Sequence, residues 1–79
     1  MKITGEMIGA ELKSLRVKKN LSIDIVSQKI NIHPNTIAKY EKNASDCKIE
    51  SFLKLLNLYE TNESIFFNIV REYNHIKDE

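Results

Sequence analysis

The sequence contains no tryptophan, one proline, one cysteine and two glycines in 79 residues. A lone cysteine excludes an intramolecular disulfide, and we interpret Cys47 as a reduced thiol of a cytoplasmic protein. So little glycine and proline leaves few turns for a chain of short strands. No apolar run approaches the roughly 18 residues that a membrane-spanning helix needs, and no signal peptide is recognisable. These absences favour a small all-α protein.

Residue patterns that carry enzymatic or metal chemistry are also missing. His33 and His75 are the only histidines and lie far apart in the chain, and Cys47 has no partner cysteine. We find no ligand spacing for a metal ion, no glycine-rich phosphate loop and no Ser/His/Asp arrangement. We therefore expect a protein that is not an enzyme and that takes no metal and no cofactor.

The length fits one small domain, residues 1–79. The charged residues of this domain are unevenly distributed along the chain. The formal net charge is only +1. Residues 1–48 nevertheless carry nine Lys or Arg against five Asp or Glu, whereas residues 49–79 carry three against six. A basic N-terminal part points to an anionic partner on that side of the molecule.

Helical periodicity runs through almost the whole chain and predicts five helices. The first carries Ile8, Leu12 and Leu15 on one face and precedes Asn20. The fourth is indicated by Ile49, Phe52, Leu53, Leu55 and Leu56, and the fifth, over residues 62–77, by Ile65, Phe66, Ile69, Val70, Tyr73 and Ile76. No repeat or linker interrupts this series of helices.

The second and third helices are short and close together. Ser22 is a good N-cap for the second, which Asn31 can end. Pro34 suits the first position of the third helix, because its missing N–H would be unpaired there in any case. Ile37 and Tyr40 would form the buried face of that helix. Two short helices about three residues apart suggest a helix-turn-helix unit.

The segment LSIDIVSQKINIHPNTIAKYEKN, residues 21–43, resembles the helix-turn-helix of lambda-repressor/Cro-like regulators, the XRE family. IGAELKSLRVKKN resembles the first helix of that family, and IESFLKLLNLYETNESIFF its last two, so that the resemblance covers about residues 8–67. It implies a five-helix lambda-repressor-like DNA-binding domain with an extended C-terminal helix. Where the family usually has glycine at three turns, this chain has Asn20, Asn31 and Asn43, the residue type that best tolerates left-handed backbone.

The same resemblance implies an ion pair that joins the first helix to the third. The family positions fall on Arg16 and Glu41, each on the rim of a buried helix face. A planar guanidinium can bind a carboxylate through two hydrogen bonds. The alternative is that Arg16 and Glu41 are unrelated surface charges.

The function implied by the resemblance is sequence-specific binding of double-stranded DNA by a transcriptional repressor. Helix 33–42 would lie in the major groove, with its base-reading positions at Pro34, Asn35 and Lys39. Asn35 suits adenine and Lys39 suits guanine, unless both merely belong to a solvated face. Contacts with the DNA backbone are expected from Ser22, Ile23, Lys29, Thr36, Lys42, Asn43 and Ser45.

Two positions depart from the family pattern. Many members have glutamine at the position of Ile23, where it bonds a phosphate, and Pro34 offers the groove only an apolar contact. An alternative function is therefore a protein-interaction module that keeps the fold but has lost specific DNA reading.

The apolar stripe of the fifth helix is wider than a peripheral helix of so small a domain needs. We expect the surplus to form a homodimer seam at Phe67, Val70, Tyr73 and Asn74. A two-fold dimer would place two reading helices about one DNA turn apart on a palindromic operator. Alternatively, the helix caps the monomer core, or the chain is the N-terminal part of a longer protein.

Overall fold

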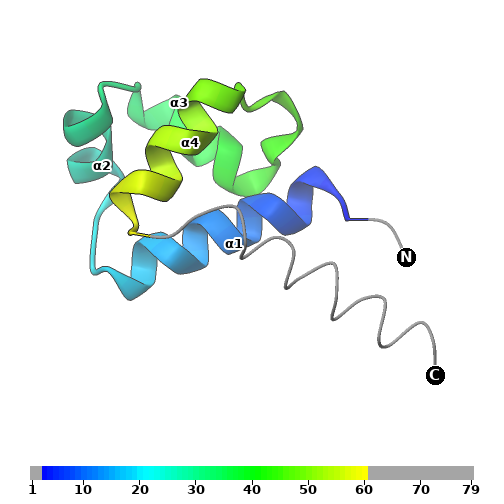
Figure 1. Cartoon of the computed structure of the whole chain (residues 1–79), viewed down its shortest axis with the longest axis horizontal. Helices are drawn as coiled ribbons and strands as arrows, with labels where there is room; N and C mark the ends of the chain where they lie inside the picture. The colour runs from blue at the N-terminus through cyan, green and yellow to red at the C-terminus, as the bar shows by residue number, and fades with distance from the viewer. Residues whose placement is uncertain (1–2, 61–79) are drawn as a thin grey trace.

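The computed structural model describes residues 3–60, which form four α-helices and one short 3₁₀ helix, with no strand in that range. In chain order these are α1 (Gly5–Lys18), α2 (Ile23–Ile30), α3 (Pro34–Lys42), the 3₁₀ helix η1 (Ala44–Asp46) and α4 (Ile49–Leu58). α1 runs along one side of the fold, and α2, α3 and α4 lie together above it in Figure 1. The fifth helix expected over residues 62–77 lies outside the described residues.

Side-chain caps define where the first three helices begin. Thr4 caps α1, and Ser22 caps α2 by accepting a hydrogen bond from the backbone N–H of Ile25 at 3.1 Å. α3 begins with Pro34 at its first position and is capped by the imidazole of His33. The predicted starts of the two short helices, at Ser22 and Pro34, are confirmed.

The turns after the helices use left-handed backbone, but not at every predicted position. Asn20 and Asn31 both have φ 57°, as predicted. Asn43 has φ −159° and ψ 113°, an extended conformation open to any residue, so the expectation of left-handed backbone there is wrong. Its side-chain oxygen instead accepts hydrogen bonds from the N–H and the hydroxyl of Ser45 at 2.9 and 2.6 Å. Glu60, after α4, takes the third left-handed turn of the described residues, with φ 55°.

One hydrophobic core receives side chains from all four α-helices. It consists of Leu12, Leu15, Val26, Ile37, Tyr40, Leu55, Leu56 and Tyr59. The predicted buried face of α3 is therefore confirmed. Two residues on the predicted apolar face of α4 are instead exposed, Ile49 by 73% and Leu53 by 50%, and Ile25 of α2 is exposed by 42%. Helices of 8 and 10 residues in so small a domain each pack through a narrow stripe, which leaves flanking apolar residues uncovered.

Two glycines let α1 approach its neighbours closely. A Cβ atom at Gly9 would lie 2.6 Å from the carbonyl oxygens of both Tyr40 and Glu41, and one at Gly5 would overlap the side chain of Ser45. The two glycines are four residues apart and so lie on one face of α1. The last turn of α3 therefore packs directly on the backbone of α1, a contact that any larger residue at position 9 would open.

Gly9→Ala is expected to lower the free energy of unfolding by about 1–2 kcal/mol, because the new methyl group would push α3 away from α1. This is the net change, after the gain of roughly 1 kcal/mol that alanine brings to a helix interior is set against the cost of the clash. Ala10→Gly is the matched control at the adjacent, exposed position of the same helix, where glycine should cost about 1 kcal/mol. Urea unfolding should thus rank glycine above alanine at position 9 and below it at position 10. A Gly9→Ala variant as stable as the unsubstituted protein would contradict the close packing.

Tyr59, which directly follows α4, is a core residue that the periodicity did not indicate. Its side chain is almost fully enclosed, with 2% of the residue exposed, and its hydroxyl has no hydrogen-bond partner. Burial, aided by the negative charge of Glu41, raises the pKa of Tyr59 to about 12. A buried hydroxyl without a partner costs on the order of 1–3 kcal/mol, so the aromatic ring stabilises the core in spite of its polar atom.

Tyr59→Phe is expected to leave stability unchanged or to raise it by roughly 1 kcal/mol, because it removes the unpartnered hydroxyl and keeps the ring. The folded-state pKa lies above the unfolded value of about 10, so the stability linked to this group is complete below about pH 10. It is then lost as the pH rises through about 12. Above about pH 10, the free energy of unfolding of the unsubstituted protein should therefore fall further than that of the variant. Parallel pH profiles would contradict the enclosed hydroxyl; lysine titration is common to both proteins and cancels.

Candidate nucleic-acid interface

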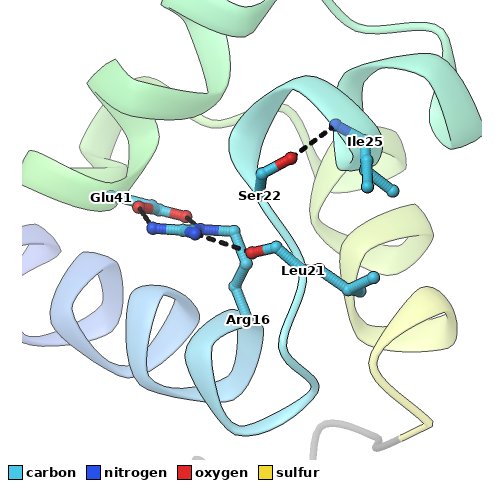
Figure 2. Close-up of polar contacts among 5 residues, drawn as sticks. All are labelled: Arg16, Leu21, Ser22, Ile25 and Glu41. Atoms are coloured by element: carbon cyan, nitrogen blue, oxygen red, sulfur yellow. Dashed lines mark hydrogen bonds and ion pairs between the residues drawn. The ribbon is translucent and has the colours of Figure 1, made fainter.

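The guanidinium of Arg16 joins three segments around the helix-turn-helix. Its Nε donates to Oε2 of Glu41 at 2.6 Å, and its Nη2 donates to Oε1 of the same carboxylate at 3.1 Å. Its Nη1 donates to the carbonyl oxygen of Leu21 at 2.8 Å. Figure 2 draws these contacts of Arg16 as dashed lines. α1 is thereby bonded both to α3 and to the loop that enters α2. Arg16 and Glu41, for which the family resemblance implies an ion pair, therefore bond to each other.

The Arg16–Glu41 pair is largely withdrawn from solvent. The exposed fractions of the two side chains are 12% and 7%. The hydrogen bond to Glu41 raises the pKa of Arg16 above its ordinary value, which keeps the guanidinium charged. In addition, the backbone N–H of Leu21 donates to the carbonyl oxygen of Arg16 at 3.2 Å. Both backbone polar groups of Leu21 are therefore held by one residue, directly before the N-cap Ser22 of α2.

α3 presents a polar face away from the core. Its exposed residues are Asn35, Ala38, Lys39 and Lys42. Spacings of three and four residues place these side chains along one face of the helix. The predicted base readers Asn35 and Lys39 therefore lie together on this outer face, whereas Pro34 and Thr36 are half-buried at its edge.

The residues expected at the DNA backbone fall into separate places. Ser22 is exposed at the start of α2, while Ile23 is half-buried and packs against the core. Asn43 and Ser45 are exposed just beyond α3 and bond to each other. These four residues flank α3 at the start of α2 and at η1.

Lys29 does not belong to that group. It lies in the last turn of α2 and lines a hollow of about 420 Å³ together with Lys54 and Asn57 of α4. The position of Lys29 therefore does not group it with the other residues predicted to contact the DNA backbone.

A second hollow connects α1, the first turn of α2 and the outer face of α3. It has a volume of about 210 Å³ and is lined by Lys13, Arg16, Ile23, Ala38, Glu41 and Lys42. Two lysines, Lys13 and Lys42, are thus among its lining residues, together with Ile23 at the N-terminus of α2, and such a setting suits a phosphate group. Lys13 was not predicted at this site. It lies one turn before Arg16, and the helical spacing from Arg16 would have indicated it.

The described residues offer little for other chemistry. Within residues 3–60, no group of three or more His, Cys, Asp or Glu is placed to hold a metal ion. None of the helices in that range has the length and apolar character to cross a bilayer. Cys47 is half-buried after η1, and burial raises the pKa of its thiol, which disfavours the reactive thiolate.

The chain matches the helix-turn-helix domain family over residues 9–72 and belongs to that family. Its fold is similar to the crystal structure of a mutant of the restriction-modification controller protein C.Esp1396I. The TM-score is 0.75 at 19% sequence identity, and the similarity covers 85% of this chain and 89% of the controller protein. At this identity the likeness establishes the fold. No curated protein matches the sequence.

Arg16→Ala is expected to lower the free energy of unfolding by about 3 kcal/mol, because it leaves the enclosed Glu41 carboxylate and the Leu21 carbonyl without their donor. Arg16→Lys keeps the charge but not the planar fork, so an intermediate loss is expected. The double variant Arg16→Met with Glu41→Leu removes both charges and should recover much of the loss. Urea denaturation of the four proteins measures this series. An unchanged midpoint for Arg16→Ala would contradict the role of the guanidinium.

Proposed function

We propose that this protein is a sequence-specific DNA-binding transcription regulator, a repressor, that reads the major groove with α3. The observation that carries the proposal is the exposed polar face of α3 in a chain of the helix-turn-helix domain family. In this motif the second helix of the pair enters the groove with its N-terminal residues at the base edges. The fold likeness to a restriction-modification controller protein supports a regulatory role.

The outer face of α3 supplies the base contacts in this proposal. Asn35 can bond both N6 and N7 of adenine, and Lys39 can donate to O6 or N7 of guanine. Pro34 provides an apolar contact suited to a thymine methyl group. Two hydrogen-bonding readers on one short helix make for a modest direct readout, so that phosphate contacts must supply much of the affinity.

The phosphate contacts are proposed on both sides of α3. On one side is the hollow lined by Ile23, at the N-terminus of α2, and by Lys13 and Lys42, whose positive charges suit a phosphate. At the other side, the side chains of Asn43 and Ser45 are exposed at η1. Thr36, at the edge of the outer face, serves either a phosphate or a base.

The protein is further proposed to act as a single domain and as a homodimer on a palindromic operator in the cytoplasm. Two-fold symmetry would match the half-site spacing to the separation of the two α3 helices. The residues proposed for the dimer seam, Phe67, Val70, Tyr73 and Asn74, lie outside the described residues.

A second candidate function is a protein-interaction module. It is favoured by the apolar side chains of Ile49 and Leu53, which lie one turn apart on α4 and are 73% and 50% exposed. Beside them is a hollow of about 200 Å³ lined by Ile8, Ala44, Cys47, Ile49 and Phe52. An exposed apolar surface of this kind is typical of protein contact sites.

Selection from a random pool of double-stranded DNA, at two salt concentrations, distinguishes these functions. We expect an enriched palindrome whose affinity falls steeply with salt, since each phosphate contact releases a counterion. Asn35→Ala combined with Lys39→Ala should reduce affinity for that palindrome by about 100-fold, since two base contacts of roughly 1–3 kcal/mol each are lost. Lys54→Ala on α4 is the matched control, which removes one lysine outside α3 and should bind nearly as the unsubstituted protein. No enrichment and negligible affinity at low salt would instead favour the interaction module.

A further inference from the structure

The N-terminus of α3 differs from an ordinary helix N-terminus in its hydrogen bonding. Pro34 has no N–H, and the N–H of Asn35 donates to Nδ1 of His33 at 3.1 Å. The N–H groups of Thr36 and Ile37 donate to the carbonyl oxygen of His33 at 3.0 and 3.2 Å. Every backbone donor of the first turn is therefore used or missing, whereas other helices leave such groups free for an anion.

The cap also fixes the tautomer of the neutral imidazole of His33. Because Nδ1 accepts the hydrogen bond from Asn35, a neutral ring must carry its proton on Nε2. His33 is exposed, and its only side-chain hydrogen bond within residues 3–60 is the one at Nδ1. The ring is thus anchored at one nitrogen and presents a free N–H donor from the other.

We propose that His33 donates its Nε2–H to an acceptor on the DNA and so supplies the donor that the backbone of α3 does not offer. This inference rests on the proposed function, because it places His33 beside the base reader Asn35 at the end of α3 that enters the groove. The acceptor chemistry is an oxygen or nitrogen of DNA, found either in a phosphate or at O6 or N7 of guanine. His33 would then both position Asn35 through the cap and contact the DNA.

Two substitutions separate the cap from the donor. His33→Ser keeps an N-cap acceptor for the N–H of Asn35, but its hydroxyl is too short to reach where Nε2 lies. His33→Ala removes both the acceptor and the donor. We expect His33→Ser to lose about tenfold in affinity for the selected palindrome and His33→Ala to lose at least as much, whereas only His33→Ala should have a lower melting temperature. Should His33→Ala fail to fold, as judged by circular dichroism, the His33→Ser comparison still decides the matter.

To find out whether the acceptor belongs to a phosphate or to guanine, we would measure affinities for a panel of operators in which each base pair is changed in turn. A guanine contact predicts that His33→Ser loses discrimination at one position of the half-site only. A phosphate contact predicts an equal loss on every operator, with the salt dependence of affinity unchanged because the neutral imidazole brings no charge to the phosphate. Either result supports the inference.

Unsubstituted affinity in His33→Ser, on a palindrome that still depends on Asn35 and Lys39, would overturn the role of His33 and leave the proposed function intact. If the unsubstituted protein selects no DNA at all, the proposed function fails and this inference fails with it.

Discussion

The bonds around the Arg16 guanidinium tie together the two helices of the helix-turn-helix. One planar group holds the Glu41 carboxylate of α3 and the Leu21 carbonyl at the entrance to α2. Because both charged side chains are nearly enclosed, neither can relax into solvent when the other is absent. The start of α2 and the position of α3 are consequently not independent of each other. α2 and α3 also pack directly on one another, while Arg16 of α1 bonds to α3 and to the loop that enters α2.

The packing of α1 against α3 uses the same residue in a second way. The backbone carbonyl of Glu41 rests over Gly9, while its side chain bonds to Arg16 about two turns further along α1. The bond between Arg16 and Glu41 thus sets where α3 lies along α1. The backbone contact at Gly9, which only glycine allows, sets the distance between the two helices. A core of eight residues alone would leave more freedom to slide, since apolar contacts have no preferred direction.

Local patterns in the sequence predicted the features that depend on local chemistry. The cap at Ser22, Pro34 at the first position of α3, and the left-handed turns at Asn20 and Asn31 each follow from the conformational preference of one residue. The buried face of α3 follows equally directly from helical spacing. Membership in the helix-turn-helix family was indicated by a resemblance spread over most of the chain, not by any single position.

Features that arise from tertiary structure could not be predicted in this way. Nothing in the order of residues indicates that the Leu21 carbonyl is the third partner of Arg16, because that bond depends on where the loop lies. Tyr59 becomes enclosed only in the folded chain, where the charges of Arg16 and Glu41 act on its hydroxyl. Asn43 was expected to be left-handed because the family often has glycine there, yet the residue can instead remain extended and bond to Ser45. The cap by His33 was missed because histidine is a rare choice where Ser, Asp or Asn are usual.

The division of α3 into two faces has a consequence for how such a protein can change over generations. Its position is held by Ile37, Tyr40 and Glu41, whereas Asn35, Ala38 and Lys39 project from the other side without taking part in the core. Substitutions on the outer face therefore carry little penalty in folding. Under the proposed function, a lineage built on this scaffold could exchange one target sequence for another by altering a few exposed residues, with each intermediate still folded. The same separation gives a designer a helix whose outer face can be changed while the residues that hold it in place stay the same.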